Sequence, residues 1–361
     1  MAWRSELIDR RSFMRAAGVT FAAALSPRSL WALERADAVF ASGFRAPDGS
    51  FGIATVSESG EIIGRVALPA RAHGMAFSRP SGHIVAFARR PGTFAMVFQP
   101  NGSLEPVVIT AAEGRHFYGH GTFSPDGRWL YASENDFDGN RGVIGVYDAS
   151  DGFARIGEFD AHGIGTHDLT VSDDGTMLAV ANGGIETHPD FGRTKLNIDH
   201  MNPLMALLDT RDGRLIQKHT LPPTLRQLST RHLAVADDGR VWFAGQWEGA
   251  RNALPSLVGY LGHGEDITFV PLPERVTAGL ANYVGAIAVN RREGIVGLTS
   301  PKGGLAVSLD AGTGAVLREE RVAEAAGVAA AAQGIAVSSY DGRFGNTRSP
   351  VAWDQHILRL G

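Results

Sequence analysis

Histidine is the residue type whose placement in this chain most suggests chemistry. His73, His120, His167 and His232 each stand a few residues before a turn of their own segment, and the first three are evenly spaced. Neutral imidazole is a good ligand for copper, iron and zinc. The chain contains no cysteine, which excludes thiolate metal sites and disulfides. These four histidines therefore predict a transition-metal site, provided that the fold brings them together.

Further side chains near these positions are candidate accessory groups. A metal-bound imidazole usually donates its other ring N–H to an acceptor, so carboxylates close to the histidines matter. The candidate accessory residues are Glu134, Asp136, Asp168, His188 and His200. We expect His116 and Tyr118 to lie in a loop, with the channel rim as the alternative. The remaining histidines do not occupy the equivalent position within a repeat and are expected at the surface: His83, His162, His219, His263 and His356.

The segments that carry the four histidines resemble one another. Gly119–Ser124 leads to a turn at Pro125–Gly127 and then to the apolar run Trp129–Ser133. Apolar strands separated by an Asp-Gly turn predict a β-hairpin. Six copies are visible, and the last two, around Gly285 and Gly334, are degenerate. A repeat of about 40 to 50 residues built from strands alone is typical of a β-propeller blade.

The repeats predict an all-β fold, a single seven-bladed β-propeller. The seventh blade would combine strands within Ala38–Val56 with a C-terminal strand at Gln355–Arg359, which closes the ring and leaves no exposed edge. The innermost strand of each blade lines the axial channel, so equivalent residues converge. Offsets of one or two residues between repeats oppose this convergence, because a one-residue shift turns a side chain to the opposite face.

Two segments depart from the repeat. The stretch between His167 and His232 is longer than the others and should form an excursion over one face. Val322–Ala332 has the one helical pattern.

The N-terminal segment has the pattern of a twin-arginine export signal. Arg10-Arg11 is followed by Phe13 and by the weakly apolar run Ala16–Leu25. Such a run is too short to span a bilayer. We therefore expect a signal peptide over residues 1–37, a propeller domain over 38–361 and a periplasmic location.

Composition limits the remaining function classes. Of 361 residues 44% are hydrophobic, which suffices for a large core, and the net charge of −4 speaks against a nucleic-acid surface. No Gly-x-Ser-x-Gly nucleophile elbow occurs, and the glycine-rich stretches lack the lysine that phosphate-binding loops require.

Several phrases resemble a known family, the twin-arginine-exported propellers of domain-of-unknown-function family 1513 (DUF1513), which are related more loosely to YVTN and WD40 propellers. The resemblance covers nearly the whole chain and rests on Gly119–Gly127, Ser133–Asp136, Gly163–His167, Ala181–Pro189 and Arg231–Leu233. It implies a seven-bladed propeller and a periplasmic location. It also implies imelysin-like and haem-peroxidase-like iron-uptake proteins as partners, and no particular reaction.

These observations lead to a first hypothesis and two alternatives. The first is a periplasmic propeller that binds copper or iron through His73, His120, His167 and His232 and serves metal acquisition rather than catalysis. One alternative is a protein-interaction scaffold with structural histidines. The other is a calcium-dependent, lactonase-like hydrolase that uses oxygen ligands at the ends of second strands, such as Glu134 and Asp136.

Overall fold

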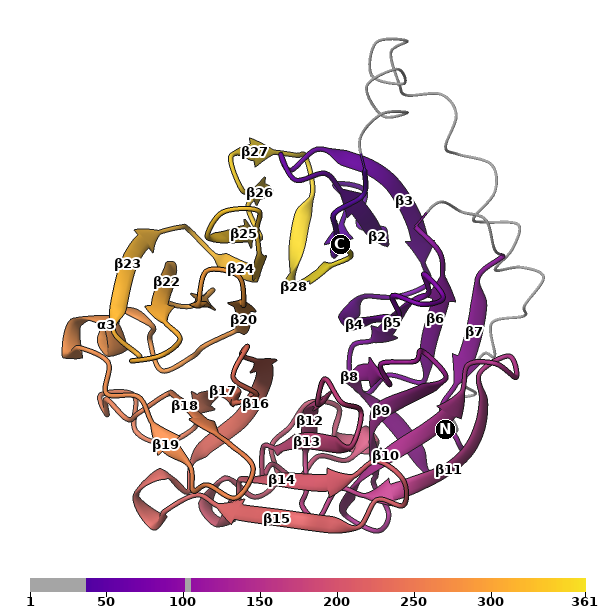
Figure 1. The fold of residues 1–361 in the computed structure, drawn as a ribbon, viewed down its shortest axis with the longest axis horizontal. Coiled ribbons are helices and arrows are strands. Elements are labelled where there is room, and N and C mark those ends of the chain that lie inside the picture. The colour runs from indigo at the N-terminus through magenta and orange to yellow at the C-terminus, as the bar shows by residue number, and fades with distance from the viewer. Residues whose placement is uncertain (1–36, 101–104) are drawn as a thin grey trace.

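Seven four-stranded sheets surround a central axis and form one closed ring (Figure 1). The computed structural model describes residues 37–100 and 105–361. All strand pairs within the sheets are antiparallel. The expectation of an all-β, seven-bladed propeller is confirmed.

The strands follow one another in a regular order, from the innermost strand of each blade outward. The closing blade holds β28 (Ala352–Arg359), β1 (Phe40–Arg45), β2 (Phe51–Val56) and β3 (Ile62–Leu68). The next three blades along the chain are β4 (Ala72–Phe77), β5 (Ile84–Ala88), β6 (Phe94–Phe98), β7 (Val107–Thr110); β8 (Arg115–Phe123), β9 (Trp129–Asp136), β10 (Arg141–Asp148), β11 (Ala154–Asp160); and β12 (Thr166–Val171), β13 (Met177–Asn182), β14 (Leu204–Asp209), β15 (Leu215–Thr220). The last three are β16 (Leu228–Val235), β17 (Val241–Trp247), β18 (Val258–Leu261), β19 (Thr268–Phe269); β20 (Ala286–Asn290), β21 (Ile295–Ser300), β22 (Leu305–Asp310), β23 (Val316–Arg321); and β24 (Ala325–Ala330), β25 (Ile335–Ser339), β26 (Arg343–Phe344), β27 (Thr347–Arg348).

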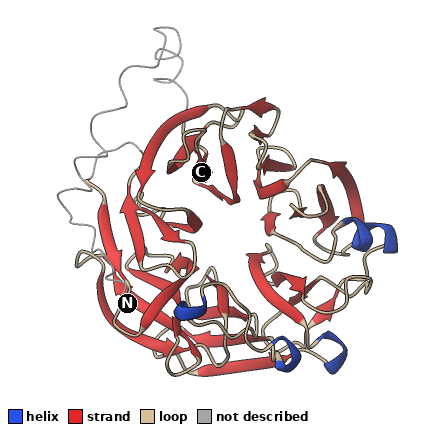
Figure 2. Cartoon of the chain, turned by 180° about the vertical axis from the view of Figure 1, so that it is seen from behind, coloured by secondary structure: helices blue, strands red, loops and turns tan. Residues whose placement is uncertain are grey.

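Helices are short and lie outside the sheets (Figure 2). Within residues 37–100 and 105–361 they are η1 (Pro189–Phe191), η2 (Ile198–His200), η3 (Pro223–Leu225) and α3 (Glu274–Gly279). The first two belong to the excursion between β13 and β14, as expected from the length of that segment. Among the described residues, no helix is both long enough and apolar enough to cross a membrane.

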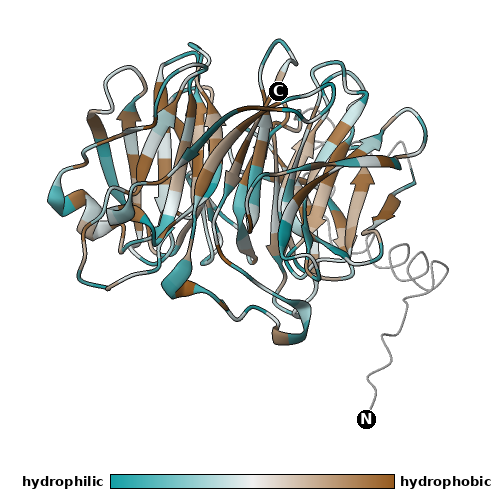
Figure 3. Ribbon diagram, turned by 90° about the horizontal axis from the view of Figure 1, so that it is seen from below, coloured by the Kyte–Doolittle hydropathy of each residue, from teal (hydrophilic) through white to brown (hydrophobic). Residues whose placement is uncertain are grey.

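The hydrophobic core lies between neighbouring blades rather than at the axis. One cluster joins Phe87 of β5 to Phe117 of β8 and Leu130 of β9, so it links two consecutive blades. Apolar residues are concentrated on the strands and hydrophilic residues on the loops at the two faces (Figure 3). Because each sheet buries both faces, every blade depends on its two neighbours for its core.

The first and last strands of the domain close the ring. β28 pairs with β1, opposite Phe40 to Arg45. Asp354 of β28 also accepts two hydrogen bonds from the guanidinium of Arg71, at 2.7 and 2.9 Å, which connects the closing blade to the next one. The predicted combination of N- and C-terminal strands is confirmed.

Two local expectations are wrong. Val322–Ala332 contains the inner strand β24 and not a helix, because pairing with β25 within the closed ring outweighs the helical preference of its alanines. His116 and Tyr118 lie within strand β8, both buried, and not in a loop. The expected signal peptide falls almost wholly on residues 1–36, outside the described residues.

Candidate metal centre on the propeller axis

Five imidazoles meet on the axis of the ring. They come from the inner strands of five consecutive blades and are His356, His73, His120, His167 and His232. Nine of the ring pairs have centroids 4.7 to 6.3 Å apart. The structure therefore brings together all four histidines of the sequence-based hypothesis and adds a fifth.

β-Bulges turn these side chains toward the axis. In β12 the register to β13 shifts between Thr166 and Asp168, which leaves His167 as the extra residue. The registers of β4, β8, β16 and β28 also shift at or beside their histidines. A bulge adds a residue to one strand and re-aims a side chain. The bulges thus compensate for the unequal offsets between repeats, which would otherwise have separated the rings.

Each of the five rings carries one buried nitrogen without a hydrogen-bond partner among the described residues. These atoms are His73 Nδ1, His120 Nε2, His167 Nε2, His232 Nδ1 and His356 Nε2. A buried polar atom without a partner costs about 1–3 kcal/mol. Five such atoms in one cluster call for an explanation, and a shared ligand is the simplest.

The imidazoles are neutral at physiological pH. Burial lowers the pKa of His120 to about 3. Burial, followed by the neighbouring histidines, holds the pKa of His73, His167, His232 and His356 well below the ordinary value. A neutral imidazole has a free lone pair, so the cluster presents lone pairs rather than cations.

Asp168 is the accessory residue that adjoins the cluster. Its Oδ1 lies 3.4 Å from His120 Nδ1, the nitrogen opposite the unpartnered Nε2. The backbone N–H groups of Leu169 and Leu233 donate to the two carboxylate oxygens of Asp168. This is the position of a carboxylate that holds a ligating histidine in one tautomer. Burial raises the pKa of Asp168 to about 7.

The geometry contains two groups of three nitrogens. In the trio His73, His120 and His356, and in the trio His120, His167 and His232, one ligand nitrogen per ring lies within 4.8 Å of the others. Metal–nitrogen bonds of about 2.0–2.1 Å place two nitrogens on one ion at most about 4.2 Å apart. Small rotations of the rings therefore suffice for coordination, and His120 belongs to both trios.

Two glycines make room for the rings. A Cβ on Gly74 would lie 2.6 Å from His120 Nδ1, and one on Gly119 would lie 2.7 Å from His73 Cδ2. Gly119 also has a φ of +110°, which favours glycine. The sequence Gly119-His120 thus combines a ligand candidate with the space for the ring of the neighbouring blade.

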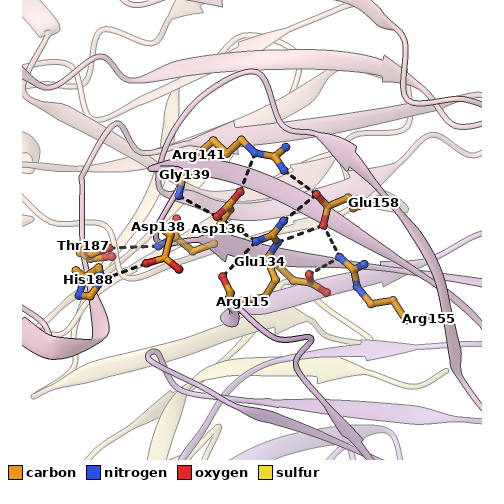
Figure 4. A network of polar contacts seen from close by, with 12 residues as sticks. Arg115, Glu134, Asp136, Asp138, Gly139, Arg141, Arg155, Glu158, Thr187 and His188 are labelled. Carbon is orange, nitrogen blue, oxygen red and sulfur yellow. Dashed lines mark hydrogen bonds and ion pairs between the residues drawn. The ribbon is translucent and has the colours of Figure 1, made fainter.

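Other candidate accessory residues take part in a separate network that spans the strands β8 to β11 of one blade (Figure 4). Glu134 is fully buried, and its carboxylate accepts from Arg155 at 2.8 Å and from the hydroxyl of Tyr147. Asp136 accepts from Arg141 at 2.8 Å and pairs with Arg115 at 3.0 Å. These carboxylates are neutralised by guanidinium groups and do not face the imidazoles.

The two histidines of the excursion are also separate from the axial cluster. His188 caps η1, where its Nδ1 accepts from the backbone N–H of Asp190, and its ring contacts Phe137. His200 is exposed at the end of η2.

The axial cluster separates two cavities of the channel. On the face where the inner strands end, a cavity of about 510 Å³ reaches His120, Asp168 and His356. On the face where they begin, a cavity of about 300 Å³ reaches His73 and His167. His232 lines both cavities, so a ligand held by the cluster would be accessible from either side.

His356 corrects the expectation that it lies at the surface. It occupies the inner strand of the closing blade, with ring centroids 4.8 Å from His73 and 4.7 Å from His232. The available signal was Gln355-His356-Ile357-Leu358, which resembles Arg231-His232-Leu233 in placing an apolar residue after the histidine. No turn of its own follows, because β28 pairs with the N-terminal strand β1 instead of a downstream hairpin partner.

We expect the metal-free protein to lose stability on acidification from pH 6.5 to 5. The unfolded histidine has a pKa of about 6.5, whereas His120 in the folded chain has one of about 3. Between these values the unfolded state binds more protons, so each such histidine removes about 1.4 kcal/mol of unfolding free energy per pH unit. This stability is fully present above pH 6.5 and is lost as the pH falls.

Urea denaturation of chelator-treated protein at pH 7, 6 and 5 measures this effect. The window lies above the range in which ordinary carboxylates titrate. Asp168, whose pKa is about 7, gains a proton in the folded state within this window and offsets the effect of about one histidine, so the cluster as a whole still loses stability. A His120→Gln variant should show a flatter profile than the unmodified protein. Equal slopes for the two proteins would contradict the assignment of His120 as a buried neutral imidazole.

Comparisons with known proteins bear on the family and the fold. A family model described as "Protein of unknown function (DUF1513)" matches residues 66–360. A search of curated proteins found no match.

Among solved structures, hydrazine synthase of Kuenenia stuttgartiensis is 14% identical with a TM-score of 0.61, over 86% of this chain and 89% of that one. A chain of a nidogen/laminin complex is 12% identical with a TM-score of 0.51, over 78% of this chain and 92% of that one. At such identities the likeness shows the fold alone.

Proposed function

We propose that the axial histidine cluster of this chain, which belongs to the DUF1513 family, binds one transition-metal ion. The family itself has no known function. The observation that carries the proposal is the set of five buried, unpartnered nitrogens on five neutral rings. Protein folding leaves such atoms unpaired only at a cost, and a metal ion satisfies several of them at once.

The donor set favours a borderline metal over a hard cation. Ca²⁺ and Mg²⁺ require oxygen ligands, and the cluster offers imidazole nitrogen with Asp168 as the adjoining carboxylate. Two of the oxygen ligands considered for the lactonase-like alternative are engaged elsewhere, with Glu134 paired to Arg155 and Asp136 to Arg141. Among divalent first-row metals, nitrogen sites bind Cu²⁺ most tightly. Copper is therefore the first proposed ion. Iron is the second, not from this affinity order, which ranks Fe²⁺ low, but because the proposed partners are iron-uptake proteins.

An ion held by one trio has the two remaining imidazoles of the other trio beside it, so further nitrogen donors stand next to its open coordination positions. A catalytic metal keeps an open position for substrate, whereas a carrier or buffering site is better served by a closed donor set. We therefore propose binding and delivery of copper or iron in the periplasm, and not turnover, as the role of this site. The proposed partners are periplasmic iron-uptake proteins of the imelysin-like and haem-peroxidase-like kinds.

Elemental analysis of the purified chain tests the proposal. Protein exported through its own N-terminal segment should carry close to one equivalent of a transition metal, and chelator-treated protein should take up one equivalent of Cu²⁺ or Fe²⁺. Coordination by several imidazoles should appear in the X-ray absorption spectrum. Protein that neither retains nor takes up a transition metal would refute the proposal, and calcium at one equivalent would favour the hydrolase alternative.

Stability provides a second readout of the same site. A ligand that binds only the folded chain raises its unfolding free energy by about 2.7 kcal/mol at one hundred times its Kd. We therefore expect the thermal midpoint to rise with added Cu²⁺ or Fe²⁺ and not with Ca²⁺. No change with any of these ions would count against binding.

A further inference from the structure

The cavity of about 300 Å³ on the face where the inner strands begin is lined by cationic side chains. His73, His167 and His232 form one wall of the cavity. The cations are Arg89, Arg90, Arg193, Arg231 and Lys302. No described carboxylate lines it.

These cations come from separate parts of the chain. Arg89 and Arg90 follow β5, Arg231 lies in β16, and Lys302 follows β21. Arg193 comes from the excursion, just after η1. Placing like charges together is unfavourable unless something of opposite charge offsets the repulsion.

The electrostatic cost is visible at two arginines. Burial and then the charge of Arg71 lower the pKa of Arg89. Partial burial and then the guanidiniums of Arg89 and Arg90 lower the pKa of Arg193 to about 10. Both side chains remain cationic at neutral pH.

The nearby carboxylates pair with only one member of this group, Arg231. Asp354 is engaged by Arg71 at 2.7 Å, and Glu248 lies between Lys195 and Arg231. Arg89 and Arg193 form no side-chain hydrogen bond or ion pair with any described residue.

Two guanidinium N–H groups also lack partners. The Nε atoms of Arg89 and Arg231 are buried and unpaired within the described part of the chain. Arg231 is 8% exposed as a residue. A buried guanidinium donor without an acceptor indicates a missing acceptor, and the cavity is where one fits.

We propose that this cavity binds an oxygen-rich polyanion of the carboxylate or phosphate class. The planar fork of arginine matches carboxylate and phosphate groups, and several arginines together favour an ion with two or more negative charges. A cavity of about 300 Å³ suits a small molecule of this kind. The proposal goes beyond metal binding and does not depend on it, since the cations are not the imidazole ligands.

Calorimetric titration of the full chain with two probes tests the proposal. Inorganic phosphate represents one class, and propane-1,2,3-tricarboxylate represents the other. Acetate, a monoanion, is the control ligand. We expect saturable binding of one or both polyanions, weakened by added NaCl, and at least tenfold weaker binding of acetate. The polyanion with the lower Kd identifies the class.

Variants locate the binding site. Arg89→Gln and Arg193→Gln should each weaken binding of the preferred polyanion about tenfold, which is the effect of losing one charge-assisted contact. The matched control is Arg318→Gln, whose side chain is 72% exposed on the outer strand β23. It should leave the affinity unchanged.

The outcomes are decisive in either direction. Absence of saturable binding of both polyanions would overturn the proposal, and so would equal affinities in the two cavity variants and the control. Metal content, measured in parallel, should stay the same in Arg89→Gln and Arg193→Gln. That result keeps the failure of the anion site distinguishable from failure of the metal site.

Discussion

A variant with His120→Ala and His167→Ala should lose its stoichiometric metal while remaining a folded ring. His120 belongs to both nitrogen trios, and His167 belongs to one of them, so the double change leaves no trio complete. Substitution of groups that only support a ligand already weakens metal binding by about 10- to 100-fold. Removing two ligands should therefore weaken it by at least about 100-fold. The measurement is metal content after dialysis, together with competition titration.

Matched variants separate ligand loss from general damage. His263→Ala removes an exposed histidine outside the cluster and should retain the full metal content. His356→Ala should weaken binding, because His356 completes the trio with His73 and His120. Circular dichroism and thermal melting report whether each variant is folded. A folded double variant with unchanged metal content would remove these histidines as ligands.

A Trp353→Ala variant should lose about 3–5 kcal/mol of unfolding free energy, the usual cost of truncating a buried tryptophan. Trp353 lies in the closing strand β28 with 0% exposure. Its ring packs against Phe344 at 5.2 Å, and its indole N–H donates to the carbonyl of Gly342 at 3.2 Å. The truncation therefore creates a cavity in the blade that closes the ring and removes one of the two hydrogen bonds to the Gly342 carbonyl, which also accepts from the backbone N–H of Ser349.

Denaturant unfolding of the metal-free chain measures this loss. Trp247→Ala is the matched control, because Trp247 is only partly buried and its indole N–H bonds an exposed loop carbonyl. We expect a clearly smaller effect there. If Trp353→Ala matched the control, β28 would not limit the stability of the ring. The same variant should also weaken metal binding, because His356 follows Trp353 by three residues on the same strand.

The two predictions are linked by the way the ring is closed. β28 supplies both the innermost strand of the closing blade and one of the five imidazoles. Antiparallel pairing with β1, which lies more than 300 residues earlier, positions that strand. A substitution that weakens β28 should therefore reduce both metal binding and the unfolding free energy of the ring.

Much of the architecture was predictable from local patterns. The segment from Gly119 to Ser133 contains an inner strand, an Asp-Gly turn and a second strand, and Gly127 adopts the positive φ of +73° that such a turn requires. Each repeat specifies its own hairpin in this way. Dependence on local patterns also explains why the helix predicted at Val322–Ala332 is wrong. The segment is rich in alanine, which favours a helix, but pairing within the ring makes it strand β24.

The candidate site was predictable only in part. His73, His120, His167 and His232 stood out because they recur in repeats that have their own turn. Glu134 and Asp136 were plausible accessory ligands by position, yet cross-strand pairing of β9 and β10 places them among Arg115, Arg141 and Arg155. These partners lie on three other strands of the same blade, and which side chains meet there depends on strand pairing, which a linear pattern does not contain.

The sequence by itself determined the repeating strand–turn–strand unit, six visible copies of it and four of the five axial histidines, because hairpin geometry depends on neighbouring residues alone. Only the tertiary structure decided that the four imidazoles meet, since that depends on bulges at each inner strand. It also decided that His356 joins them and that Arg89, Arg193 and Arg231 share one cavity. The physical reason is that closure of the ring converts positions far apart in the chain into neighbours on one axis.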